Sequence, residues 1–304
     1  MAMTFVSVPG GGLASFPHHR GLKGSRIQPV TAAVQPPMNV RGTIKQVREA
    51  VQASLQARMS RIEICTPKNA SFQLEKSKES STSSEANADA ASTRELTKLF
   101  IEFFRGNDLG IVAVFPTKQA ADKAKKSWGP DHEYRVTSLK EMRKTSRSGF
   151  GGSAIQEDEN VVIIAGGGSK ELTMVQRLSD DLGQDVLIVA LNMRVDSSGQ
   201  DSKTVEKFRK AFDTVYWYQV GPHPRWNGGI LFKSYPEDWM LCRVGTFRQV
   251  KTLLTSPTRP TEADIVSAFR GEQEDDTSQG VVDRISSLFS PLLRPKDGDD
   301  TVKK

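Results

Sequence analysis

The residues best placed for chemistry are Gly166, Gly167, Gly168 and Ser169, which follow the apolar run Val161 to Ala165 and precede a helical pattern. Where a strand ends in glycines and a helix begins, backbone N–H groups and the helix dipole can hold a phosphate or a carboxylate. The turn has neither the Gly-x-Gly-x-x-Gly spacing nor a Walker lysine followed by Ser or Thr. It is a candidate anion-binding turn, and the alternative is an ordinary tight connection between strand and helix.

A second candidate is the loop 221–229, in which two prolines would display His223, Arg225 and Trp226. Loops that present such side chains often bind a partner. His223 has no companion at metal-ligand spacing, and no Ser or Cys has the setting of a nucleophile, so we predict no metal and no catalytic residues. The loop is either a partner-binding element or a rigid turn whose tryptophan packs on the domain.

A third candidate is an apolar helical face within residues 281–293, after an acidic stretch at 272–276. Its members are Val282, Ile285, Leu288, Phe289 and Leu292. This face either packs back on the domain or docks on a thylakoid surface or another protein. The lysine and arginine runs between 118 and 147 are typical of solvated helix faces, and the formal net charge is only +6. We therefore expect no nucleic-acid partner.

The N-terminal segment has the composition of a targeting sequence. No Asp or Glu occurs from Met1 to Arg48, while serines and basic residues recur among glycines and prolines. This predicts a chloroplast transit peptide over 1–33, with a disordered tail as the alternative, and Gly10 to Gly12 with Pro17 interrupt any secretory apolar core. No run of about 18 apolar residues occurs, so no transmembrane segment is predicted and membrane contact would be peripheral. Cys65 and Cys242 are expected to be buried free thiols.

The body alternates between strand and helix patterns, which predicts an α/β fold: a doubly wound, mostly parallel sheet with an antiparallel hairpin at its C-terminal edge. Thr261 with Asp264 resembles a capping box. The predicted strands are 61–66, 111–115, 134–138, 161–165, 185–191, 215–220, 229–235 and 239–244. The predicted helices are 43–60, 93–105, 118–128, 170–182, 203–212 and 261–269.

Three regions follow from these patterns. Residues 1–33 are the predicted transit peptide, and residues 34–270 form a single α/β domain. Within that domain, 75–92 and 146–160 are polar or glycine-rich and are expected to be flexible loops. Residues 271–304 comprise an acidic linker, the amphipathic helix 281–293 and a disordered tail.

The segment Gly229 to Pro236, the pair Asp238-Trp239 and the run Arg259 to Thr261 resemble a domain family of oxygenic phototrophs. That family includes the Low PSII Accumulation proteins, which assist photosystem II assembly, and a domain appended to some plastid adenylate-kinase-like proteins. The resemblance covers about residues 40 to 270. It implies a chloroplast protein and supplies no catalytic residues to transfer.

Two functions from different classes follow. The first is a non-enzymatic plastid accessory protein, in the stroma or on the stromal face of the thylakoid, that binds a photosynthetic complex such as photosystem II and needs no cofactor. The second is a nucleotide- or phosphometabolite-binding enzyme that uses the turn Gly166 to Ser169, with Lys170 or Arg225 assisting. A third and weaker hypothesis is RNA binding through the basic helices.

Overall fold

The computed structural model describes residues 34–67, 85–105, 109–130, 133–146, 155–156, 158–193, 195, 202–226, 228–245 and 249–272. Two compact units divide the chain, Met1–Val34 and Gln35–Lys304, and all described residues but Val34 belong to the second. The predicted transit peptide 1–33 and the predicted helix 281–293 lie outside the described residues.

Helices and strands alternate along the chain as far as the strand 213–220, after which three more strands follow one another. Most elements lie close to the predicted positions, but the helix Leu139–Ser146 was not predicted. The helices are α1 Val40–Gln56, α2 Glu85–Phe104, α3 Lys118–Trp128, α4 Leu139–Ser146, α5 Leu172–Asp181 and α6 Ser202–Ala211, and a further helix spans 262–272. The strands are β1 Arg61–Cys65, β2 Gly110–Phe115, β3 Arg135–Ser138, β4 Glu159–Ala165, β5 Leu187–Leu191, β6 Asp213–Val220, β7 Gly229–Ser234, β8 Trp239–Val244 and β9 Val250–Ser256.

These strands form one sheet of nine within the described residues, in the order β3-β2-β4-β5-β1-β6-β7-β8-β9. Every pair from β3 to β6 is parallel, and the pairs β6–β7, β7–β8 and β8–β9 are antiparallel. The α/β fold with a mostly parallel sheet is therefore confirmed. Continuous apolar strands such as β4 suit this position, because both faces of a parallel sheet are covered.

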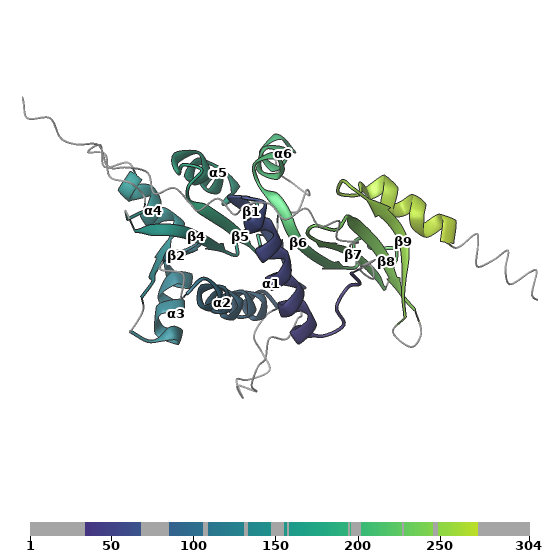
Figure 1. The fold of residues 1–304 in the computed structure, drawn as a ribbon, viewed down its shortest axis with the longest axis horizontal. Coiled ribbons are helices and arrows are strands. Elements are labelled where there is room, and N and C mark those ends of the chain that lie inside the picture. The colour runs from purple at the N-terminus through teal and green to yellow at the C-terminus, as the bar shows by residue number, and fades with distance from the viewer. Residues whose placement is uncertain are drawn as a thin grey trace, which may run out of the picture. The chain divides into compact units, whose positions relative to one another are not determined.

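Helices cover both faces of the sheet (Figure 1). Connections from one parallel strand to the next are right-handed, so a connection that moves toward β3 and one that moves toward β6 lie on opposite faces. Accordingly α2 and α3 lie on one face, together with α1, whereas α4, α5 and α6 lie on the other (Figure 1). The helix 262–272 packs on the α6 face of the antiparallel half, where Ile265 and Phe269 contact Leu241.

A large core fills the space between the parallel strands and α4 to α6. Val162 and Ile164 of β4 point toward this layer and pack with Leu172 of α5 and Phe208 of α6. All four side chains are fully buried. Their burial supplies roughly 1.5–3 kcal/mol per side chain before the entropy of folding is counted, which fixes the helices against the sheet.

A buried arginine ties β1 to the end of α5. Arg61 is 7% exposed and donates to the carbonyl oxygens of Leu182 at 2.7 Å and Val186 at 2.6 Å. It also donates to the carbonyls of Ser60, Ser179 and Gly183 and to the Ser179 hydroxyl. The last carbonyls of a helix have no partner within the helix, and a cation there is favourable. Burial lowers the pKa of Arg61, and Asp180 opposes that shift.

The prediction of a loop at 75–92 is wrong for its second half, because α2 begins at Glu85 rather than near Thr93. Alanine is the strongest helix former, and Ala86, Ala88, Ala90 and Ala91 all fall in this stretch. The stretch 85–92 holds no large apolar residue, so it carries little hydrophobic periodicity. Within the other predicted loop, 146–160, the structure places the start of β4 at Glu159.

The C-terminal half of the sheet contains one more strand than predicted. The hairpin β7–β8 is present, but β9 lies outside it and forms the edge. The ladder between β8 and β9 shifts register between Leu241 and Cys242. As a result Leu253 and Leu254 both pack against the core around Phe269, which hides the alternation that normally reveals a strand.

The predicted capping box at the last described helix is present. The Asp264 carboxylate accepts from the Thr261 backbone N–H at 2.8 Å, and the Thr261 hydroxyl accepts from the Asp264 N–H at 3.2 Å. Two N–H groups that the helix leaves unpaired are satisfied in this way.

Candidate functional site

The glycine-rich turn lies where α/β proteins most often bind ligands. β2 and β4 are neighbours, and the helices that follow them, α3 and α5, lie on opposite faces, which is the position at the carboxyl ends of the strands where open α/β sheets bind ligands. Gly166 has φ of 75° and Gly167 has φ of 110°. Both values lie in the left-handed region that side chains disfavour, which is why glycine is needed here.

A carboxylate of the chain itself occupies this turn. Glu171, the residue before α5, accepts from the Gly168 backbone N–H through Oε2 at 2.8 Å. The same side chain lies close to Gly167, where an added Cβ would be 3.6 Å from the Glu171 side chain. A negative charge at a helix N-terminus is favourable, so Glu171 takes the place that a bound anion would have. A phosphate at Gly168 would face this carboxylate.

A second polar cluster lies between β1 and β5, whose following helices also take opposite faces. Asn192 follows β5 directly, is 4% exposed and has φ of 52°. The side-chain oxygen of Asn192 accepts from the backbone N–H of Thr66 at 2.8 Å, and its side-chain NH2 group donates to the Thr93 hydroxyl at 3.2 Å. The amide group thus joins the ends of two strands to α2. Sequence reasoning missed Asn192, although its position directly after an apolar strand was a usable signal.

The most unusual ionisable group is Glu63, in the middle of β1. Only 2% of it is exposed, and it accepts a hydrogen bond from the Thr214 hydroxyl at 2.8 Å. Burial raises the pKa of Glu63, while the positive charges of Arg259 and Arg209 act in the opposite direction. A buried carboxyl with a raised pKa resembles a catalytic acid, but its burial leaves little surface for a ligand to touch.

Arg259 extends from the segment between β9 and the helix 262–272 and covers two tryptophans on this face. Its guanidinium lies 3.9 Å from the ring centre of Trp217 and 5.4 Å from that of Trp239. The two rings pack with Cys65 and Leu231 in one apolar cluster. Stacking on aromatic faces suits arginine in particular. The Glu63–Arg259 region therefore joins the antiparallel half of the sheet to the parallel half.

The loop that contains His223, Arg225 and Trp226 packs against the helix 262–272. Trp226 stacks on Phe269 with ring centres 5.2 Å apart, and His223 contacts the Trp226 ring at 4.6 Å. The Nε2 atom of His223 lies 3.6 Å from the Glu262 carboxylate. These contacts agree with a rigid turn whose tryptophan packs on the domain, and partner binding by the exposed Arg225 stays a prediction.

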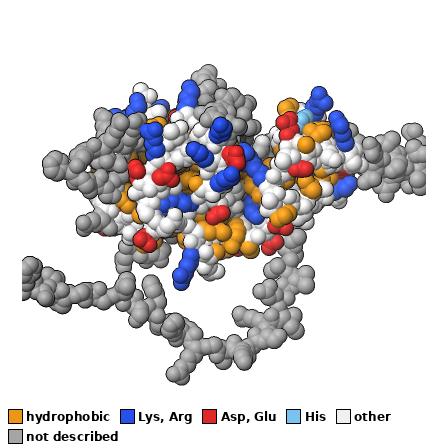
Figure 2. All heavy atoms as spheres, turned by 90° about the horizontal axis from the view of Figure 1, so that it is seen from above, with side chains coloured by type: hydrophobic (Ala, Val, Ile, Leu, Met, Phe, Trp, Pro, Cys, Tyr) orange, Lys and Arg blue, Asp and Glu red, His pale blue; other side chains and the backbone are white. Residues whose placement is uncertain are grey.

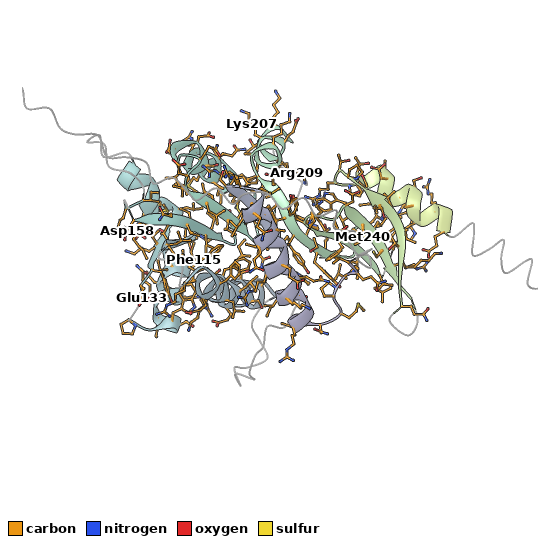
Figure 3. The ribbon with its side chains drawn as sticks, viewed as in Figure 1. Phe115, Glu133, Asp158, Lys207, Arg209 and Met240 are labelled. Atoms are coloured by element: carbon orange, nitrogen blue, oxygen red, sulfur yellow. The ribbon has the colours of Figure 1, made fainter. Side chains whose placement is uncertain are left out.

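Basic side chains gather on the α6 face of the protein, with acidic side chains among them (Figure 2). Lys203, Lys207, Arg209 and Lys210 are exposed on α6, and Figure 3 labels Lys207 and Arg209 there. Lys210 pairs with Glu206 at 2.8 Å. The mixture of signs is typical of a solvated helix face.

The described part of the chain has neither a metal-binding cluster nor a membrane-spanning helix. There, no group of three or more His, Cys, Asp or Glu side chains is arranged to hold a metal ion. No described helix is both long and apolar enough to cross a bilayer. Cys65 and Cys242 are buried free cysteines, as expected, and burial raises the pKa of the Cys242 thiol.

Comparison with known proteins gives a family without an assigned activity. No curated protein matches the chain. A family model described as a domain of unknown function, DUF1995, matches residues 37–267, from just before α1 into the last described helix. That span is most of the chain and includes the whole sheet, so the protein belongs to the DUF1995 family.

Proposed function

We propose that the protein is a non-enzymatic accessory protein of the plastid that binds a subunit or an assembly intermediate of a photosynthetic complex such as photosystem II. The acid-free segment from Met1 to Arg48 supports import into a plastid. Membership of the DUF1995 family is compatible with the resemblance to the Low PSII Accumulation proteins. Together these observations favour an accessory role over metabolic chemistry.

The observation that carries the proposal is the hydrogen bond from the Gly168 N–H to the Glu171 carboxylate at 2.8 Å. An enzyme of phosphorylated metabolites would use the N–H groups of this turn to hold a phosphate, and here a negative charge opposes that use. At the ends of β1 and β5, the Asn192 side chain is hydrogen-bonded to Thr66 and Thr93. The polar groups at this edge of the sheet are thus hydrogen-bonded to one another. This favours binding of a partner protein through an outer surface instead.

Native electrophoresis of plastids that express the tagged chain tests the proposal. Gently solubilised thylakoids and stroma are separated, and the migration of the chain is compared with that of photosystem assembly intermediates. Co-migration is the expected result. Loss of co-migration on deletion of 281–293 would assign the apolar face there to the partner. Turnover of a metabolite by the purified protein, with none of it in plastid complexes, would overturn the proposal.

A thermal-shift experiment with nucleotides and sugar phosphates separates the two function classes. A ligand at 100 times its Kd raises stability by about 2.7 kcal/mol, which is measurable as a higher Tm. We expect no shift for the wild type. The variant Glu171→Gln keeps an acceptor for the Gly168 N–H and removes the charge, so a shift in this variant alone would identify the carboxylate as the group that excludes phosphate. A shift in the wild type would favour the phosphometabolite enzyme.

A further inference from the structure

We propose that Glu272, Arg243 and Lys251 form an electrostatic latch that holds the end of the described chain on the sheet, and that this latch opens at Gly271. The inference goes beyond the proposed function and does not depend on it. Three features of the described residues carry it: a carboxylate held between two cations, partial exposure of both cations, and a glycine that nothing in its surroundings requires.

The carboxylate of Glu272 lies between two cations on neighbouring strands. Arg243 of β8 and Lys251 of β9 are directly opposite each other in the ladder. The Nη1 atom of Arg243 lies 2.8 Å from Oε2 of Glu272, and the Nζ atom of Lys251 lies 3.4 Å from Oε1. Like charges directly opposite each other on adjacent strands are destabilising. The carboxylate therefore relieves a repulsion between the strands as well as forming two ion pairs.

The two sides of the latch differ in their access to water. Glu272 is 7% exposed, although the sequence places it at the start of a predicted acidic linker. The side chains of Arg243 and Lys251 are 41% and 60% exposed. Water and salt ions therefore reach the two cations, and ion pairs that are exposed in this way are weak and depend on ionic strength. Such a latch can open without unfolding of the domain.

Gly271 is the weak point of the helix 262–272, which lies beside β9 (Figure 1). A Cβ at this position would meet no atom within 4 Å, and Gly271 is not among the glycines with positive φ. Neither space nor backbone conformation therefore requires glycine here. Its effect is to lower the equilibrium constant for forming this helical turn by about two- to fivefold relative to alanine.

Apolar contacts hold the helix on the sheet only before Gly271. Ile265 and Phe269 are buried against Leu241. After Phe269, only Glu272 is buried in the described chain, and the two cations hold it there. Opening at Gly271 therefore frees Glu272 while Phe269 stays in place. In the closed state, the latch fixes the start of the segment that contains the predicted helix 281–293.

Amide hydrogen exchange of the purified full-length chain, followed by NMR, tests the latch. Glu272→Gln keeps the shape of the side chain and removes its charge, so the protection factors at Arg270 and Gly271 should fall by at least about threefold. The protection factor at Leu241, in β8, should not change, which separates opening of the latch from global unfolding.

The matched control is Glu262→Gln, the same charge change at an exposed position of the same helix. It should leave the protection factors at Arg270, Gly271 and Leu241 unchanged. Equal protection at Gly271 in Glu272→Gln and in the wild type would overturn the latch. A loss of protection at Leu241 as large as that at Gly271 would also overturn it.

Two further measurements test the glycine and the charge dependence. Gly271→Ala should raise the protection factors at Arg270 and Glu272 by about two- to fivefold, because alanine favours the helical turn and its Cβ meets open space. Raising KCl from about 50 to about 500 mM should lower protection at Arg270 in the wild type and leave it unchanged in Glu272→Gln. Unchanged protection in Gly271→Ala would overturn opening at Gly271. Equal salt sensitivity in Glu272→Gln and in the wild type would overturn the role of the ion pairs.

The latch and the proposed function fail in different ways. All of these measurements use the purified protein alone. If no plastid complex contains the chain, the proposed function is wrong while the latch stands. If the protection factors do not respond to Glu272→Gln, the latch is wrong while partner binding stands.

Discussion

Replacement of Arg61 by methionine should destabilise the fold strongly, because this one side chain donates hydrogen bonds to six acceptors. Hydrogen bonds to a charged group contribute about 1.5–3 kcal/mol each, but they do not add fully. The carbonyls of Gly183 and Val186 lie beside exposed or half-buried positions and can recover water. The carbonyl of Leu182 and the hydroxyl of Ser179 are more deeply buried. We therefore expect a loss of about 3–5 kcal/mol, the range for removal of one partner from a buried charged network.

Urea unfolding followed by circular dichroism measures this loss, and a thermal scan should show a Tm lower by about 6–20 °C. Arg61→Lys keeps the charge but offers three donors for six acceptors, so its loss should be roughly half as large. Arg41→Met, at an exposed position of α1, is the control and should change stability by less than about 0.5 kcal/mol. If the free energy of unfolding of Arg61→Met lies within about 1 kcal/mol of that of Arg41→Met, the reasoning that α5 depends on this arginine is refuted.

Three further substitutions test other parts of the fold. Glu63→Gln should raise stability by about 1–3 kcal/mol at neutral pH. Burial raises the pKa of Glu63, so the difference in unfolding free energy between Glu63→Gln and the wild type should vanish in acid. That difference should widen as the pH rises through the ordinary range of glutamate pKa values. A difference that does not change with pH in urea titrations would contradict this. Gly229→Ala places a Cβ 2.7 Å from Phe269, whose ring is held by Trp226, so calorimetry should show a loss of about 1–3 kcal/mol. Asp264→Ala removes the capping box and should lower the Tm in the same assay, with Glu262→Ala as a neighbouring control.

Local sequence patterns were sufficient to predict most of the helices and strands. The continuous apolar run at β4 and the Pro- or Gly-bounded runs at β2 and β7 each form a strand, because burial on both faces requires such residues. The start of α2 was predicted incorrectly because its first turns hold alanine and polar residues without an apolar stripe. β9 was missed because a register shift places two consecutive leucines against the core.

The chemistry of the ionisable groups was harder to predict, because it depends on contacts between distant segments. In the sequence, Glu63 is one polar residue in an alternating strand, and nothing local indicates that it is buried. The crossovers place β6 beside β1, and the return of the chain after β9 brings Arg259 over Trp217. The raised pKa of Glu63 therefore results from the topology.

The glycine-rich turn shows how one neighbouring side chain changes a functional hypothesis. Gly166 to Ser169 would suit a phosphate on backbone geometry alone, and Glu171 stands close by in the sequence. The carboxylate reaches the Gly168 N–H because the positive φ values at Gly166 and Gly167 turn the chain back toward α5.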